Sequence, residues 1–217
     1  MDFEAARKHM VDSQVRTNDV TDLRIQRAFE TVERERFLPV ELKAQAYVDR
    51  EVVYAPGRSL MTPRDFSKLL AALEIRPTDL ILDVGCGTGY SSAVLAQLGE
   101  MVVAVESEAD LAARAQENWA ASGVVNAAVV ASDLAAGAAK QGPFDVIVIS
   151  GAIETEPAAL LKQLKDGGRL GAVVRRGGVA KGTIWRRSGA AVASHEAFDA
   201  TARIVLPGFT QPKAFVF

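Results

Sequence analysis

Hydrophobic positions recur with a helical period in the first part of the chain. Over residues 22–39 apolar side chains stand at roughly helical spacing, with Asp22 placed to cap a helix and Pro39 to end it. A second helix is predicted from Thr62, because this capping threonine precedes Pro63 at the first helical position and then an apolar face. The N-terminal part is therefore predicted to be mainly helical.

Beyond residue 77, short apolar runs alternate with helical segments. The apolar runs predict strands at 79–84, 101–106, 125–133, 143–150 and 167–174. The intervening segments predict helices at 90–99, at 107–123 with Ser107 as N-cap, and at 155–168. Strands joined by helices pair in parallel through right-handed crossovers, so the fold class is α/β with a doubly wound sheet. An antiparallel hairpin is predicted around Ser188 and Gly189, and a final strand at 212–217.

Composition narrows the class of protein. The chain has 217 residues, a net charge of −2 and 49% hydrophobic residues, which is typical of one globular domain and excludes disordered and collagen-like compositions. No apolar run reaches the roughly 18 residues of a membrane span. The single cysteine, Cys86, leaves no internal disulfide. We expect a cytoplasmic setting without nucleic-acid or membrane partners, and the sequence leaves the oligomeric state open.

The strongest chemical signal is the segment 81–90, in which a predicted strand leads into three alternate glycines and then a helix. Gly85, Gly87 and Gly89 let the backbone approach a ligand closely at the carboxyl edge of a parallel sheet. Their spacing departs from the dinucleotide pattern GxGxxG, and the Lys-Thr pair of a phosphate-binding loop is missing. The segment therefore predicts a ligand other than a triphosphate.

Three acidic residues are predicted to line the same edge. Glu106 ends the second strand, where a carboxylate can accept both ribose hydroxyls of an adenosine. Asp133 follows the third strand, near the expected adenine, and Asp83 would be a costly core residue without partners. An acidic edge suits a ligand with positive charge, such as the sulfonium and ammonium groups of S-adenosylmethionine.

Each of these residues also has a structural interpretation. The glycines can make a tight turn, Glu106 can be a solvated strand end and Asp133 a turn residue, although their combination favours a nucleoside site. Cys86 is interpreted as a small apolar filler rather than a nucleophile, because no base lies close in sequence. We assign no role to the two histidines, and we expect the two tryptophans to be packing residues.

Several motifs resemble one enzyme family over nearly the whole chain. LDVGCGTGY, PFDVIVIS and LLKQLKDGGRL are similar to segments of S-adenosylmethionine-dependent, Rossmann-like methyltransferases. RERFLP and AYVDR resemble the PRxxFxP and AYxD elements of the protein-L-isoaspartate O-methyltransferases. The resemblance implies a single methyltransferase domain over 1–217. In it, residues 1–76 form N-terminal helices and an active-site loop that cover the active-site edge, and residues 77–217 form the cofactor-binding α/β core with a C-terminal antiparallel strand pair.

The same resemblance implies methyl transfer from S-adenosyl-L-methionine to the α-carboxylate of an L-isoaspartyl residue in a damaged protein or peptide. A carboxylate is ionised at neutral pH, so such an enzyme needs no general base and works by orientation and exclusion of water. Ser59 and Thr62 are the expected catalytic residues. The expected cofactor-binding residues are Ser59, Asp83, Gly85, Cys86, Gly87, Gly89, Tyr90, Glu106, Ser107, Ser132, Asp133, Leu134 and Ser150.

One loop departs from the family pattern. Residues 57–63 correspond to the family's G-x-T-I-S-x-P loop, with Ser59 at the threonine position and Met61 at the serine position. A thioether cannot donate a hydrogen bond, and Thr62 stands one place later. Two other functions therefore stay open. One is a methyltransferase for a different acceptor, such as a small molecule, and the other is a cofactor-binding regulatory module without turnover.

Basic residues are concentrated between Lys162 and Arg187, where eight stand against one acid. The ordinary interpretation is a solvated face. Arg175 and Arg176 follow the fifth predicted strand at the functional edge of the sheet, however. We therefore also carry the hypothesis that they attract a carboxylate-bearing peptide or an acidic partner.

Overall fold

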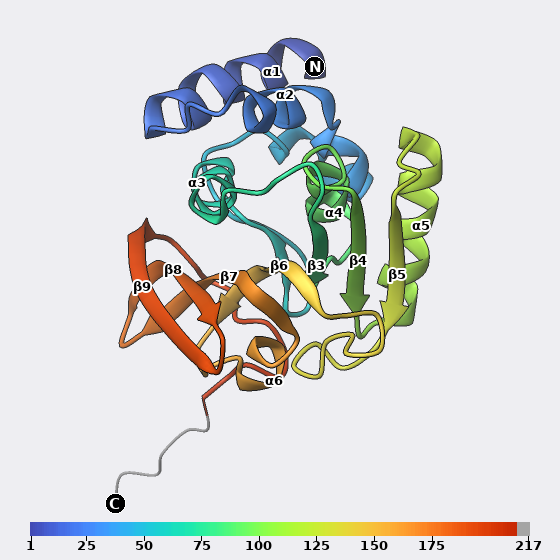
Figure 1. The fold of residues 1–217 in the computed structure, drawn as a ribbon. Helices are drawn as coiled ribbons and strands as arrows, with labels where there is room; N and C mark the ends of the chain where they lie inside the picture. Colours follow the sequence, from blue (N-terminus) through green and yellow to red (C-terminus); the bar gives the residue numbers. More distant parts are fainter. Residues whose placement is uncertain (212–217) are drawn as a thin grey trace, which may run out of the picture.

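The computed structural model describes residues 1–211 as a mixed α/β structure built on one central sheet (Figure 1). The helices are α1 (Phe3–Met10), α2 (Leu23–Thr31), α3 (Pro63–Leu73), α4 (Tyr90–Leu95), α5 (Ala109–Ser122) and α6 (Ala158–Leu161). The strands are β1 (Val52–Ala55), β2 (Arg58–Leu60), β3 (Leu80–Val84), β4 (Met101–Glu106), β5 (Ala127–Ala131), β6 (Phe144–Ile153), β7 (Leu164–Arg176), β8 (Val179–Ser188) and β9 (Ala191–Ala200). Shorter helical turns occupy Val11–Val15, Arg16–Asn18, Arg34–Phe37 and Val40–Gln45. The final strand predicted at 212–217 lies outside the described residues.

The strands of the central sheet are ordered β5-β4-β3-β6-β7-β8-β9. The first five in this order pair in parallel, whereas β8 pairs antiparallel with β7, and β9 antiparallel with β8. This confirms the predicted α/β fold class and the C-terminal antiparallel pair, whose turn contains Gly189 at φ +58°. The chain reverses its direction of winding between β3 and β6. Such a switch point is where open α/β sheets bind ligands.

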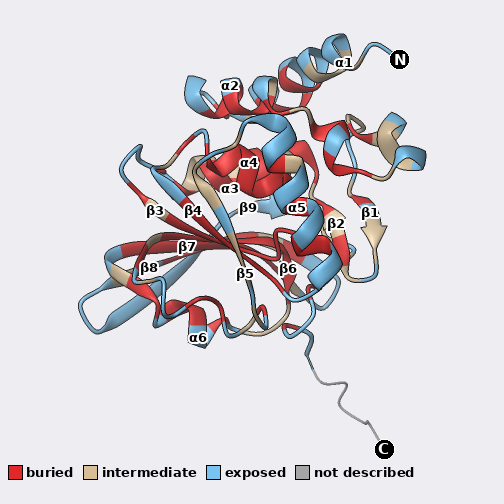
Figure 2. Ribbon diagram, turned by 90° about the vertical axis from the view of Figure 1, so that its right-hand side faces the viewer, coloured by how far each residue is buried: buried red, intermediate tan, exposed pale blue. Residues whose placement is uncertain are grey.

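Each face of the sheet has its own hydrophobic core (Figure 2). On one face α3, α4 and α5 cover the strands, with α1 and α2 outside them, and buried Phe29 and Phe66 belong to this core. On the other face, the single turn of α6 and irregular segments contribute Leu134, Leu161 and Phe209. The second layer is therefore made largely of loops, which bring distant parts of the chain close to the strand ends.

The N-terminal helix α2 begins where the sequence predicts and ends earlier. Asp22 caps it by accepting a hydrogen bond from a backbone amide of its first turn. The helix predicted over 22–39 is wrong beyond Thr31, because the chain becomes extended at Val32 and then forms a short separate turn. That break directs the side chain of Phe37 into the core, where it is 1% exposed.

The helix predicted over 155–168 is also wrong in length. Only the turn of α6 is helical, and β7 already begins at Leu164. The side chain of Gln163 accepts a hydrogen bond from the Ala138 amide at 3.0 Å and donates to the Ala136 carbonyl at 2.8 Å. These bonds tie the segment to the loop after β5, so the chain enters the sheet instead of continuing the helix.

Two predicted helix caps have different outcomes. Thr62 caps α3, since its hydroxyl accepts a hydrogen bond from the Asp65 amide at 3.0 Å. The prediction that Ser107 caps α5 is wrong, because its hydroxyl instead accepts a hydrogen bond from Arg58 at 3.0 Å. Glu108 occupies the capping position without a side-chain bond.

The N-terminal region reaches the carboxyl edge of the sheet through a hairpin and through the helical turn Arg34–Phe37, whose Phe37 carbonyl accepts a hydrogen bond from the Thr88 hydroxyl at 2.6 Å. Strands β1 and β2 pair antiparallel, and Arg58 on β2 contacts Glu106 at the end of β4. Helices α1 and α2 lie instead over α3 and α4 (Figure 1). Helices α1 and α2 therefore do not reach that edge, whereas the turn Arg34–Phe37 and residues 52–60 lie there; that the N-terminal residues cover an active site stays a prediction.

A buried ion pair joins α3 to the sheet. Arg169 on β7 is 5% exposed and donates to Asp79 at 2.6 Å. It also donates to the carbonyls of Leu73 and Glu74 at the end of α3, each at 2.7 Å. A buried pair of this kind is costly to break, because removing one partner leaves the other charge without compensation.

Arg169→Met is therefore expected to lower the free energy of unfolding by about 3 kcal/mol. Lys165→Met is the matched control, since Lys165 pairs with Asp145 at the surface and its loss should cost less than about 1 kcal/mol. Urea unfolding followed by circular dichroism measures both. Equal losses in the two variants would contradict the structural role given to the buried pair.

Candidate active site

The glycine loop lies at the switch point, between the end of β3 and the start of α4. Gly85, Gly87 and Gly89 have φ values of +79°, +56° and +97°, which glycine adopts without strain. The Gly85 amide donates to the Val105 carbonyl on β4 at 2.9 Å, and the Gly89 amide to the Cys86 carbonyl at 2.8 Å. The first bond anchors the predicted loop to β4, and the second closes a turn within the loop itself.

Glu106 ends β4 beside this loop and is 0% exposed. Its Oε2 accepts hydrogen bonds from the Gly87 amide and from Arg58 Nε, both at 2.9 Å. Its Oε1 accepts from the amides of Ser107 at 2.8 Å and Glu108 at 3.0 Å, and from Arg58 Nη2. Burial alone raises the pKa of Glu106, but the hydrogen bonds, that of Arg58 foremost, outweigh it and lower the pKa overall. The buried residue is therefore an ionised carboxylate.

Asp83 forms the floor of the site and is also 0% exposed. Its Oδ2 accepts the hydroxyls of Ser91 and Ser92, and its Oδ1 accepts that of Ser150, each at 2.6 Å. Burial raises the pKa of this carboxyl. Three hydroxyl donors satisfy the group without a counter-ion, which explains how a carboxyl is tolerated in the middle of the sheet.

The predicted residues after β5 do not gather at one place. Asp133 is exposed and accepts a hydrogen bond from the Ala135 amide at 2.8 Å, as a turn residue does. Leu134 is buried in the core on the α6 face. Ser132 remains at the strand end, where its amide donates to the Glu106 carbonyl at 3.2 Å. The structure brings Ser132 and Glu106 together and directs Leu134 away from them.

Three side chains that the sequence analysis missed lie over the glycine loop. Tyr54 on β1 covers Gly87, where an added β-carbon would overlap the tyrosine hydroxyl. Leu206, from the segment after β9, covers Gly85, where an added β-carbon would lie 2.9 Å from Leu206 Cδ1. The third side chain is Arg58, which forms an ion pair with Glu106 at the end of β4. All three are distant in sequence from what they contact, so no local pattern indicated them.

Both predicted catalytic hydroxyls make structural hydrogen bonds. Ser59 on β2 donates to the carboxylate of Glu51, whose other oxygen accepts from the Arg203 amide at 2.6 Å. Thr62 caps α3. Between them Met61 is half-buried and packs against the core. The candidate loop is therefore held to the segment after β9 through one carboxylate.

A small cavity of about 20 Å³ lies against this loop and holds two donors that lack partners. Its lining residues are Arg34, Tyr54, Ser59, Leu60, Met61, Phe66, Gly85, Cys86, Tyr90, Ser91 and Ser150. Arg34 Nη1 and the Tyr90 hydroxyl are buried without a hydrogen-bond partner. The guanidinium lies 4.7 Å from the centroid of the Tyr90 ring, and its other nitrogens donate to the carbonyls of Ala46 and Met61 at 2.7 Å. Within residues 1–211, none of the ion pairs includes Arg34.

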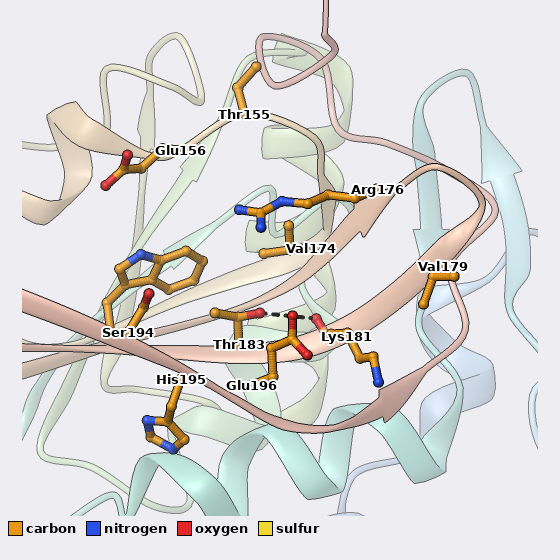
Figure 3. A pocket seen from close by; sticks show the side chains of 11 residues that line it. Thr155, Glu156, Val174, Arg176, Val179, Lys181, Thr183, Ser194, His195 and Glu196 are labelled. Carbon is orange, nitrogen blue, oxygen red and sulfur yellow. Dashed lines mark hydrogen bonds between the residues drawn. The ribbon is translucent and has the colours of Figure 1, made fainter.

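A larger cavity of about 470 Å³ lies on strands β7, β8 and β9 (Figure 3). Acidic and basic side chains are interleaved along it, including Glu156, Arg176 and Glu196, and none of the predicted site residues lines it. In the part of the chain that the structure describes, no group of three or more His, Cys, Asp and Glu side chains is arranged to hold a metal ion. The chemistry indicated by the sequence therefore stays with the glycine loop.

The basic segment from Lys162 to Arg187 is largely explained by ion pairs. Five of its eight basic residues pair with acids, as Lys165–Asp145, Arg169–Asp79, Arg175–Glu154, Lys181–Asp199 and Arg186–Glu74. The charge of Arg175 is therefore paired with that of Glu154, while Arg176 lines the larger cavity. Among residues 1–211, no helix combines the length and apolar character needed to cross a membrane.

A mostly parallel sheet with three glycines at its switch point and a buried carboxylate at the end of the next strand defines an α/β protein of the nucleoside-binding class. A family model described as Protein-L-isoaspartate(D-aspartate) O-methyltransferase matches residues 5–196. The chain belongs to this family. The protein-L-isoaspartate O-methyltransferase of Koribacter versatilis is 36% identical over 168 residues, 77% of this chain and 76% of that protein. The one of Methanoculleus marisnigri is 38% identical over 168 residues, with the same shares.

Solved structures agree with the fold. A protein-L-isoaspartate O-methyltransferase superposes with a TM-score of 0.79 at 24% identity over 93% of this chain, which spans 66% of the length of that chain. A Plasmodium falciparum protein assigned to the same enzymes, solved in complex with S-adenosyl-L-homocysteine, gives a TM-score of 0.78 at 17% identity, over 94% of this chain and 99% of that chain. At these identities the likeness shows the fold.

The lowered pKa of Glu106 predicts how stability depends on pH. The ion pair with Arg58 contributes fully above the ordinary glutamate pKa of 4.5, and its contribution is lost as the pH falls through the lower pKa of the folded state. Glu106→Gln is therefore expected to be less stable than the wild type at pH 7, with a difference that shrinks below about pH 4. Thermal unfolding of both proteins across this range measures it. A difference that persists unchanged in acid would contradict the assigned ionisation.

Proposed function

We propose that this protein transfers a methyl group from S-adenosyl-L-methionine to the α-carboxylate of L-isoaspartyl residues in damaged proteins or peptides. The observation that carries the proposal is the glycine loop at the switch point with Glu106 buried at the end of the neighbouring strand, in a chain of this family. The proposal treats the chain as one domain, with 1–76 as cover and 77–217 as cofactor-binding core. It places the protein in the cytoplasm, which its single unpaired cysteine supports.

The residues at the switch point fit an adenosine cofactor. Glu106 offers carboxylate oxygens where ribose hydroxyls are accepted, and Gly85 and Gly87 allow close approach of backbone to ligand. Ser132 at the end of β5 would face the base, and Asp83 with its serines would support the floor. When bound, S-adenosyl-L-methionine supplies an electrophilic methyl group. The side chains now lying over these residues must move for the chain to hold it.

For this reaction the chain supplies orientation rather than acid-base chemistry. An α-carboxylate has a pKa of about 3.5 and is ionised at neutral pH, so it needs no base to become a nucleophile. The buried groups at the site agree with this. Asp83 is bonded to three hydroxyls, and burial raises the pKa of the Cys86 thiol, which stays protonated and inert. The chain therefore contributes packing, which excludes water and holds the acceptor oxygen in line with the bond from the methyl group to sulfur.

Arg34 and Tyr90 are the donors best placed to hold the acceptor carboxylate. Ser59 donates its hydroxyl to Glu51, the Thr62 hydroxyl oxygen accepts the capping bond from the Asp65 amide, and Met61 has no donor. Arg34 Nη1 and the Tyr90 hydroxyl, by contrast, lack partners and line the same small cavity as Met61. Buried donors without partners are costly, and an ionised carboxylate would satisfy both. We include this carboxylate site in the proposal.

Methyl transfer to an isoaspartyl peptide tests the proposed function directly. The wild type is expected to methylate it and to leave the matching aspartyl peptide unmodified, as followed with radiolabelled methyl donor. Met61→Ser is expected to be active as well, because it restores a hydroxyl at the family's serine position without disturbing Arg34. No transfer to the isoaspartyl peptide by either protein, with cofactor binding confirmed by calorimetry, would move the function to another acceptor or to a role without turnover.

Tyr90→Phe tests the carboxylate site. The substitution keeps the ring packing against Phe37 and Phe66 and removes a hydroxyl without a partner, so the melting temperature should not fall. Loss of a hydrogen bond to a charged group is expected to raise KM for the peptide about 10-fold with little change in kcat. Tyr47→Phe is the control, since this hydroxyl donates to Glu35 outside the cavity and its loss should leave KM unchanged. An unchanged KM in Tyr90→Phe would limit Tyr90 to packing.

A further inference from the structure

The hairpin β1–β2 occupies the space in which Glu106 would receive a ribose. We propose that Arg58 is an internal competitor of the cofactor, which takes the carboxylate oxygens of Glu106 and thereby sets the affinity of the site for S-adenosyl compounds. The inference rests on the proposed function for the identity of the cofactor. It concerns a residue that stands between Gly57 and Ser59 in the loop where the chain departs from the family pattern.

The Glu106 carboxylate can accept only a limited number of hydrogen bonds. A carboxylate has about four lone-pair sites. Glu106 already accepts from six donors: the amides of Gly87, Ser107 and Glu108, two nitrogens of Arg58 and, at 3.4 Å, the Ser107 hydroxyl. No acceptor capacity is left for two ribose hydroxyls. The three amides belong to fixed backbone, so Arg58 is the donor that can leave.

The ion pair between Arg58 and Glu106 is buried. Arg58 is 1% exposed and Glu106 is 0% exposed. The guanidinium makes two parallel contacts to the carboxylate, donates to the Ser107 hydroxyl at 3.0 Å and donates to the Gly57 carbonyl at 3.0 Å. A bidentate, desolvated pair with its remaining donors satisfied is a strong interaction. A cofactor must therefore displace a formed interaction rather than bind an exposed carboxylate.

Side chains of the protein itself fill the space next to the glycine loop. The Tyr54 side chain lies against Gly87, so the same hairpin that carries Arg58 also covers the face of the glycine loop. Leu206 covers Gly85 and also Gly151, where an added β-carbon would lie 2.7 Å from Leu206 Cγ. The glycines that would let a ligand approach the backbone are thus in contact with the chain's own side chains.

The hairpin and the segment after β9 form one closed cover. Ser59 and the Arg203 amide bind the same carboxylate, that of Glu51. Pro207 packs on Gly57, where an added β-carbon would lie 3.1 Å from Pro207 Cγ. Because the closed arrangement excludes the cofactor, the apparent dissociation constant equals the intrinsic one divided by the fraction of open molecules. Weakening the cover at Arg58 should raise that fraction and tighten binding.

Calorimetric titration with S-adenosyl-L-homocysteine tests the proposal. Arg58→Met removes the competing charge and leaves Glu106 with three backbone amides, and we expect its dissociation constant to fall at least 10-fold relative to the wild type. Tyr54→Ala removes the half-buried side chain that lies against Gly87. It is expected to tighten binding without changing the ion pair of Arg58 with Glu106. Glu106→Gln also breaks the ion pair but loses the ribose acceptor, and it should bind more weakly than Arg58→Met.

The control is Arg50→Met. Arg50 is an exposed arginine that donates to Gln45, and its removal should leave the dissociation constant unchanged. Melting temperatures verify that each variant is folded, and Tyr54→Ala keeps the test decisive if Arg58→Met does not fold. Unchanged or weaker binding in folded Arg58→Met and Tyr54→Ala would overturn the competition while leaving methylation by the wild type as a separate result. Absence of binding in every variant would overturn both this inference and the proposed function.

Discussion

The buried charge of Glu106 is the constraint around which the site is built. A carboxylate with 0% exposure must be compensated, and the structure compensates it with three backbone amides and one buried arginine. The amides come from the glycine loop and from the turn after β4, so they fix the carboxylate at the switch point. The arginine comes from the hairpin β1–β2. Ionisation of one residue thus holds an N-terminal segment of the chain against the carboxyl edge of the sheet.

The rest of the site depends on the contacts that hold the hairpin β1–β2 and the segment after β9 over the glycine loop. The carboxylate of Glu51 joins the hairpin to the segment after β9, and Leu206 extends that segment over the glycine loop. Beneath this cover, Arg34 and Tyr90 keep donors without partners in a small cavity. The residues proposed to bind the cofactor thus contact other parts of the chain itself, whereas the donors proposed for the acceptor carboxylate lack partners. Binding of the two substrates is expected to differ in this respect, because only the cofactor has an internal competitor.

Local patterns in the sequence predicted those features that depend on local physics. The strand before the glycine loop, the three glycines with positive φ and the carboxylate at the end of β4 were found because each is defined by a few adjacent residues. Two predictions were wrong because other contacts overrode the local preference. Ser107 does not cap α5, because its hydroxyl accepts a hydrogen bond from Arg58. The helix predicted at 155–168 is shorter, because the Gln163 side chain binds the loop after β5. The partner of Glu106 lies 48 residues away, and an ion pair across that separation leaves no periodicity to detect. The roles of Ser59 and Thr62 in the reaction stay predictions.

A bound nucleoside and Arg58 are expected not to share the carboxylate of Glu106. A crystal structure of the wild-type protein with S-adenosyl-L-homocysteine tests it most directly. The account predicts that the ribose hydroxyls contact Glu106, that the guanidinium of Arg58 has left it, and that the Tyr54 side chain has moved off Gly87. A ribose held at Glu106 with the Arg58 ion pair intact, or a nucleoside bound elsewhere with the hairpin still closed, would contradict it.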